Sequence, residues 1–381
     1  MAKSVVLFVL AAATIGCSTV LAVEHVVLRR DGRELAASGE LLEQAADGGL
    51  LVQGADGVLW SIQPDELVSH TSDDAQFVPL DSDELSRQLL AELPEGFEAY
   101  STAHYVICHN TSQAYAQWCG ALFERLYKSF TNYWTQRGLE LHEPRFKLVA
   151  VVFADGESYQ QHAAPVLGEA ASQIIGYYHL QDNRMTMYDL TGVQSLRDKG
   201  DRRGSASEIN RMLARPEAER TVATIIHEAT HQIAFNCGLH SRTADIPLWL
   251  SEGIALYFET PDLKSSKGWR NIGAVNRVRL AGFRQYLPRR PADSLESLLA
   301  DSTRLRDTRT ANDAYSEAWA LTYFLIRQRP KQFHEYLKLL AEKPALTVDE
   351  PETRLQDFRR IFGADLRSID AEFLKHMGKV K

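Results

Sequence analysis

The sequence has few cysteines and prolines, and acidic residues outnumber basic ones. Four of its 381 residues are cysteines and 13 are prolines, which excludes a disulfide-dense scaffold and a collagen-like or proline-rich chain. The 42 basic and 50 acidic residues give a formal charge of −8, so general affinity for nucleic acid is not expected. What is present is an ordinary soluble composition, 45% hydrophobic and 24% charged, in a chain long enough for two or three units.

The first residues are typical of an export signal. Lys3 supplies a positive charge, and the apolar run from Ser4 to Ile15 is too short to be a comfortable membrane span. Small residues favour cleavage after Ala22, while an imperfect lipoprotein signal ending at Cys17 and an uncleaved anchor reaching Val23 are alternatives. We therefore predict an exported protein, in the periplasm, at the cell envelope or secreted, whose mature chain has no transmembrane domain.

The cysteines beyond this signal are Cys108, Cys119 and Cys237. An odd number cannot pair completely within one chain. Cys108 and Cys119 could form a disulfide in an oxidising compartment, or they could be buried as small hydrophobic residues.

Turn signals and hydrophobic spacing predict an α+β fold, with a small N-terminal β-meander, a lobe of mixed sheet and helices, and a mainly helical lobe. Asp-Gly pairs between short apolar runs indicate the meander, because both residues tolerate the positive φ of tight hairpins. The expected divisions are a signal peptide at 1–22, a β-rich module at 23–70, a linker with an amphipathic helix at 71–99, an α/β lobe at 100–200 and a helical lobe at 201–381.

Four segments of the α/β lobe have clear patterns. They are a strand at Tyr105–Ile107, a long helix from Ser112 to Gln136, a buried strand from Leu148 to Phe153 and a hairpin from Gly176 to Tyr188. Helical periods dominate from Pro216 onward.

The strongest chemical signal is His227-Glu228-Ala229-Thr230-His231, inside an apolar, helix-compatible segment. On a helix, residues i and i+4 share one face, so both imidazoles can reach a single Zn²⁺ at about 2.0 to 2.1 Å. Glu228 would lie about 100° around the helix from His227, where its carboxylate can touch a metal-bound water without joining the ligands. The spacing predicts His227 and His231 as metal ligands and Glu228 as general base.

A catalytic zinc also needs a third protein ligand and an open position. Glu252 is the favoured candidate, because Pro247 suits a first helical turn and a helix fixes a ligand better than a loop does. Asp245 is the alternative, in a segment with no helix to position it.

With these residues the chain resembles the gluzincin metallopeptidases, which combine HExxH with a distant glutamate in a peptidase MA-like domain, and more specifically an uncharacterised bacterial secreted family of that type. The resemblance covers roughly Tyr100 to Leu374 and rests on the HExxH motif and on Trp249-Leu-Ser-Glu252-Gly253. It implies a gluzincin-like lobe in which His227, His231 and Glu252 bind Zn²⁺ and Glu228 is the base. The metzincin branch is excluded, because it would place glycine and histidine where Ala234 and Cys237 stand.

A further match begins at Tyr315 and looks like the helix that carries a transition-state tyrosine in gluzincin aminopeptidases. The resemblance implies that Tyr315 stabilises an oxyanion; alternatively, it simply begins a buried helix with Ala318, Leu321 and Phe324 at core spacing. The Gly-x-Met-Glu-Asn segment with which those aminopeptidases hold a free N-terminus is absent, which argues against exopeptidase activity. The hairpin from Gly176 to Tyr188 takes its place in the order of elements, where its edge could pair with an extended peptide.

We therefore expect an exported zinc-dependent endopeptidase with a peptide or protein substrate. The alternative is a non-catalytic binding protein of the cell envelope on the same scaffold, with structural zinc or none. Intact Glu228 argues against that alternative, because a structural site needs no base beside its metal.

Residues 264–290 contain eight basic and no acidic residues. Such a stretch could attract an anionic substrate or envelope polymer. The favoured interpretation is a solvated helix face that pairs with acidic segments elsewhere.

Overall fold

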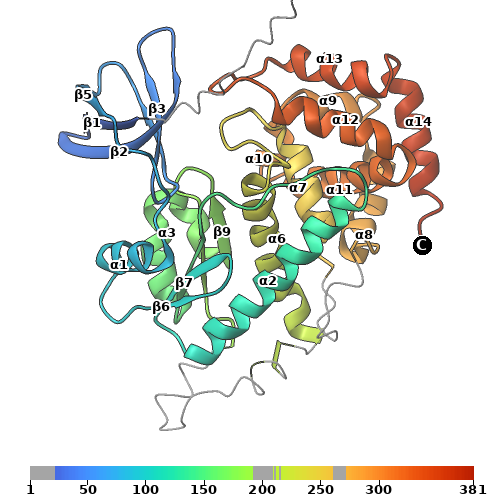
Figure 1. Ribbon diagram of the computed structural model, residues 1–381. Helices are drawn as coiled ribbons and strands as arrows, with labels where there is room; N and C mark the ends of the chain where they lie inside the picture. The colour runs from blue at the N-terminus through green and yellow to red at the C-terminus, as the bar shows by residue number, and fades with distance from the viewer. Residues whose placement is uncertain (1–21, 192–208, 210–211, 214–215, 261–271) are drawn as a thin grey trace, which may run out of the picture. The chain divides into compact units, whose positions relative to one another are not determined.

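The computed structural model describes residues 22–191, 209, 212–213, 216–260 and 272–381 (Figure 1). The described residues form two compact units, the first made of residues 22–55 and 61–78, the second of residues 56–60 and 79–381. Nearly all of the predicted signal peptide, including Cys17, lies outside the described residues. No helix in these ranges is both long and apolar enough to cross a membrane.

The first sheet is the predicted β-meander with one added strand. It consists of β1 (Val23–Arg30), β2 (Arg33–Gln44), β3 (Leu50–Gly54), β4 (Leu59–Ile62) and β5 (Leu67–Asp73), in the order β4-β3-β2-β1-β5. Asp31 and Gly32 join β1 to β2 with φ values of 53° and 73°, which is the backbone that an Asp-Gly hairpin turn favours. The strand β5 returns to pair antiparallel with β1.

The second sheet has the order β6-β7-β8-β10-β9. Its strands are β6 (Glu98–Ser101), β7 (Tyr105–His109), β8 (Leu148–Phe153), β9 (Gly176–His179) and β10 (Arg184–Tyr188). The three central strands are parallel, whereas β6 and β9 run antiparallel to their neighbours at the two edges. The predicted strands and hairpin of this lobe are therefore confirmed.

Helices cover both faces of this sheet because its central strands are apolar on both sides. The helices α1 (Ser82–Glu92) and α3 (Gly156–Leu167), followed by η1 (Gly168–Ser172), pack with Val106, Cys108 and Val151. The opposite face, with Ile107, Ala150 and Met187, packs against α2 (Gln113–Thr135) and α6 (Pro216–Asn236). The HExxH motif, which is part of α6, therefore lies on this second side of the sheet.

Cys108 and Cys119 lie on opposite faces of the sheet, in two different apolar clusters. Both thiols and that of Cys237 are buried and unbridged. The alternative of a disulfide between Cys108 and Cys119 is therefore wrong, and the alternative of buried small hydrophobic residues holds.

In the described part of the chain from Leu248 onward the regular structure is helical, as predicted. It comprises α7 (Leu248–Phe258), α8 (Arg277–Tyr286), η2 (Leu287–Arg289), α9 (Ser294–Ala300), α10 (Thr303–Arg306), α11 (Ala311–Gln328), α12 (Pro330–Ala341), α13 (Pro351–Phe362) and α14 (Leu366–Met377).

The helices α7 and α11 lie side by side (Figure 1). Gly253 of α7 contacts Thr322, and a Cβ at this glycine would stand 2.9 Å from the carbonyl oxygen of Ala318. Only glycine permits so close an approach of the two helices at this position. An α+β fold with a helical C-terminal region is thus established.

Candidate metal centre

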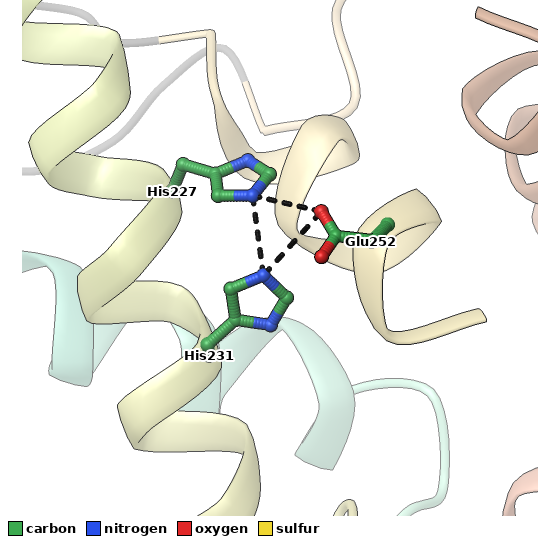
Figure 2. A group of neighbouring side chains, drawn as sticks. All are labelled: His227, His231 and Glu252. Atoms are coloured by element: carbon green, nitrogen blue, oxygen red, sulfur yellow. Dashed lines mark hydrogen bonds and ion pairs between the residues drawn. The ribbon is translucent and has the colours of Figure 1, made fainter. Parts of the chain in front are cut away.

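The helix α6 presents both histidines of the motif on one face. The Nε2 atoms of His227 and His231 are 3.1 Å apart, and their ring centroids are 4.8 Å apart at an angle of 79°. Figure 2 shows the two rings projecting from the same side of α6. One helical turn between i and i+4 accounts for this arrangement.

The helix α7 brings Glu252 to the same point (Figure 2). Its Oε2 atom lies 3.0 Å from Nε2 of His227 and 3.6 Å from Nε2 of His231. The three side chains are 13%, 11% and 12% exposed in the order His227, His231, Glu252. Two imidazoles and a carboxylate therefore converge in a nearly closed space.

These distances fit a tetrahedral zinc ion. Ligand bonds of about 2.0 to 2.1 Å at tetrahedral angles place neighbouring ligand atoms about 3.3 Å apart. The observed separations of 3.0, 3.1 and 3.6 Å straddle that value. A metal ion bound by these three side chains would have one tetrahedral position left for another ligand.

The charges of the two histidines and of Glu252 are strongly coupled. Burial alone lowers the pKa of His227, but the hydrogen bond and charge of Glu252 outweigh it and raise that pKa to about 9. Burial likewise raises the pKa of Glu252, yet the two imidazoles hold it well below its usual range. A carboxylate that stays ionised in a buried place requires positive charge beside it, which protons or a metal ion can supply.

Glu228 stands next to this group without joining it. Its Oε2 atom accepts a hydrogen bond of 2.9 Å from the backbone N–H of Tyr178 in β9. Burial raises the pKa of Glu228, and the charges of His227 and His231 oppose part of that rise. A carboxylate with a raised pKa that is held by one hydrogen bond suits a group that accepts and releases a proton.

Asp245, the alternative third ligand, is engaged elsewhere. Its Oδ2 atom accepts hydrogen bonds from Arg354 at 2.6 Å and from the backbone N–H of Asp349 at 2.9 Å. Glu252 is the carboxylate that completes the group with the two histidines.

Tyr315 lies in the first turns of α11. It is partly buried, and its pKa is raised by burial and by the charges of Glu252 and Glu228, which Arg279 opposes. The guanidinium carbon of Arg279 is 5.7 Å from the centroid of the Tyr315 ring. The phenol is thus within electrostatic reach of both carboxylates of the candidate site.

A buried network of amide side chains joins α6 to the hairpin of β9 and β10. The sequence patterns did not predict it. Asn236 donates to Oδ1 of Asn183 at 2.7 Å and accepts from Nδ2 of Asn183 at 2.9 Å. Gln232 donates to the carbonyl oxygens of Asn183 and Val149, and the hydroxyl of Tyr178 donates to Asn183. Asn183 lies in the turn between the two strands with a φ of 62°, a backbone conformation that asparagine adopts more readily than most residues do.

One family model matches the part of the chain that contains the candidate site. A family model described as a protein of unknown function (DUF1570) matches residues 221–347. The matched segment includes His227, Glu228, His231, Glu252 and Tyr315. No curated protein matches the chain. The match covers less than half of the chain and carries no activity with it.

Proposed function

We propose that this protein is a zinc-dependent metallopeptidase of the gluzincin type that acts as an endopeptidase. One observation carries the proposal: the ligand atoms of His227, His231 and Glu252 converge within 4.8 Å of one another, with Glu228 adjacent but outside the group. A structural site would have no use for that fourth residue. Export is part of the proposal and rests on the N-terminal sequence alone.

His227, His231 and Glu252 would hold Zn²⁺, which supplies Lewis acidity for a carbonyl group and a water molecule. Glu228 takes the proton from the attacking water and passes it to the nitrogen of the leaving amine. Tyr315 donates a hydrogen bond to the oxygen that gains negative charge when the carbonyl is attacked.

The edge strand β9 supports a peptide as the substrate. It pairs with β10 on one side and ends the sheet, and in the described part of the chain no strand pairs with its other edge. Tyr178, in this strand, contacts Glu228 directly. An extended peptide added along that edge would run past the proposed base.

Substitution of the base tests the proposal. Glu228→Gln removes the proton acceptor but no ligand, so we expect peptide cleavage to fall by a factor of at least about 10² to 10⁴ while bound zinc stays at the wild-type level. Cleavage is measured with an unbiased peptide library and zinc by elemental analysis.

Two further variants test whether Glu252 or Asp245 is the third metal ligand. Glu252→Gln is expected to weaken zinc binding by at least about 100-fold, whereas Asp245→Asn should leave it unchanged.

Hydrolysis at the wild-type rate by Glu228→Gln would remove Glu228 from the mechanism. Zinc binding without cleavage of any library peptide would favour the non-catalytic binding protein instead.

A further inference from the structure

The helix α8 places a basic side chain, Arg279, beside Tyr315 of α11. It packs against α11 on the side where Gly282 faces Ser316, and a Cβ at Gly282 would lie 2.5 Å from Oγ of Ser316. Arg279 precedes Gly282 by three residues and therefore lies on the same face of α8. Its guanidinium reaches the ring of Tyr315, with 5.7 Å between the guanidinium carbon and the ring centroid.

Another face of α11 packs against α7, the helix that carries Glu252. Tyr315, Ala318 and Thr322 follow the i, i+3, i+7 spacing of one helix face, and Ala318 and Thr322 contact Gly253, next to Glu252. Tyr315 continues this face by one turn. Tyr315 therefore contacts Arg279 and stands on the face of α11 that packs against the ligand-bearing helix α7.

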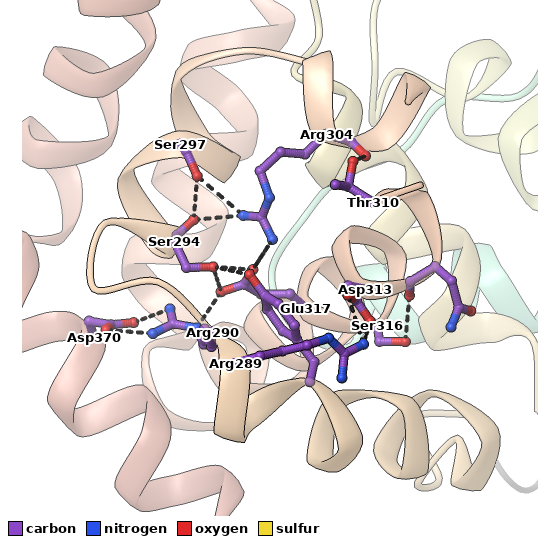
Figure 3. A network of polar contacts seen from close by, with 12 residues as sticks. Arg289, Arg290, Ser294, Ser297, Arg304, Thr310, Asp313, Ser316, Glu317 and Asp370 are labelled. Atoms are coloured by element: carbon purple, nitrogen blue, oxygen red, sulfur yellow. Dashed lines mark hydrogen bonds and ion pairs between the residues drawn. The ribbon is translucent and has the colours of Figure 1, made fainter. Parts of the chain in front are cut away.

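Arg289 and Arg290, which follow α8 in the chain, both have carboxylate partners. Figure 3 shows Arg289 paired with Asp313, and Arg290 held between Glu317 and Asp370. Among the described residues no carboxylate pairs with Arg279, which is only partly exposed. Glu259, at the end of α7, instead accepts a hydrogen bond from Asn276 at 3.1 Å.

A partly buried guanidinium without an acidic partner is costly unless a ligand supplies the charge. Its planar fork matches a carboxylate, which it can bind through two parallel hydrogen bonds. The ring of Tyr315 holds the side chain by a cation–π contact and leaves its N–H groups available for such a ligand.

We propose that Arg279 binds a carboxylate of the substrate, so that the site selects peptides with an acidic group near the cleaved bond. The carboxylate belongs to an Asp or Glu side chain or to the C-terminus of the peptide; the chemistry at Arg279 is the same. This assignment rests on the proposed peptidase function and adds a substrate class to it.

Binding to the zinc-loaded, inactive Glu228→Gln protein tests the assignment without turnover. Four fluorescent peptides of one sequence carry Asp or Asn beside the cleaved bond, each with a free or an amidated C-terminus. We expect a carboxylate in one of these positions to tighten binding by about 10- to 100-fold, as measured by fluorescence anisotropy. The Asp–Asn and acid–amide pairs distinguish the two sources.

Arg279→Gln in the same background should abolish this preference, and a zinc content and thermal melting curve like those of the parent show that the variant is folded. Arg277→Gln is the matched control: it removes the same charge from an exposed position about 200° around the same helix and should preserve the preference.

Equal affinities for all four peptides would overturn the role of Arg279 and leave the peptidase function standing. A preference that persists in Arg279→Gln would overturn it as well, because another residue would then recognise the carboxylate. If the wild-type protein cleaves no peptide and the inactive variant binds none, both the assignment and the peptidase function fail.

Discussion

At the scale of single residues, the candidate site depends on which polar groups face one another in a buried space. Oε2 of Glu252 is 3.0 Å from Nε2 of His227, and neither group could be buried alone without a large loss of free energy. Glu228 differs in having a backbone N–H as its partner. In the proposed function three of these residues are ligands and the fourth is the base, and this division rests on what each side chain faces in the structure.

The HExxH spacing and the helix after Pro247 were enough to predict this group from the sequence, because both features are local. The contact between Glu228 and Tyr178 was not predictable, since it joins a helix to an edge strand 50 positions earlier in the chain. Arg279 could be predicted only as one member of a basic segment. Its contact with Tyr315 depends on the packing of α8 against α11, which the sequence pattern does not give.

The three buried thiols give a prediction at this scale. Burial raises the pKa of Cys108 and of Cys237 to about 12, and that of Cys119 well above its usual value. With a pKa near 12, only about one thiol in ten thousand is ionised at pH 8, and the thiolate is the reactive form. We expect no reaction of these thiols with a disulfide reagent in the native mature chain, and labelling of all three after denaturation.

Labelling of a single thiol after denaturation without reductant would reveal a bridge that the structure does not have. Rapid labelling of the native protein at pH 8 would show that the sheet does not shield Cys108 and Cys119. A mature chain that keeps Cys17 would add one further thiol or lipid-modified residue, which mass spectrometry identifies.

At the scale of elements, the amide network determines where β9 lies relative to α6. Asn183, Gln232 and Asn236 are buried and bonded to one another and to Tyr178, so the hairpin cannot shift without breaking several hydrogen bonds at once. The hairpin itself was predictable from its turn residues. Its attachment to α6 was not, because buried amides follow no periodic pattern.

Asn236→Ala tests this attachment. It removes the hydrogen bonds to Asn183 and leaves that side chain unpaired, so we expect the free energy of unfolding to fall by about 1 to 3 kcal/mol in urea denaturation. If the proposed function is right, kcat should fall as well, because the Tyr178 N–H would no longer fix Glu228. Asn132→Ala, at an exposed position of α2, is the control and should change neither quantity. Unchanged stability of Asn236→Ala would show that the network does not hold the hairpin.

Across the second unit, one buried ion-pair network ties the helices around the site together (Figure 3). Glu317 of α11 is fully buried and accepts hydrogen bonds from Arg290, Arg304 and Ser294. Arg290 also pairs with Asp370 of α14. Side chains from α9, from α10 and from the residue after η2 therefore meet at one carboxylate of α11, two residues after Tyr315, and Arg290 links that carboxylate to α14.

Glu317→Gln is expected to destabilise the protein more than any exposed charge change. The substitution keeps the size of the side chain but leaves Arg290 and Arg304 facing an uncharged group, and breaking a buried ion pair in this way costs about 3 to 5 kcal/mol. Glu352→Gln, whose side chain is 62% exposed in its pair with Arg359, should cost less than about 1 kcal/mol. Urea denaturation gives both values.

Because the metal ligands stand on α6 and α7, outside this network, Glu317→Gln should still bind zinc below its melting temperature. Loss of zinc from the folded variant would show instead that the position of α11 controls the geometry of the ligands.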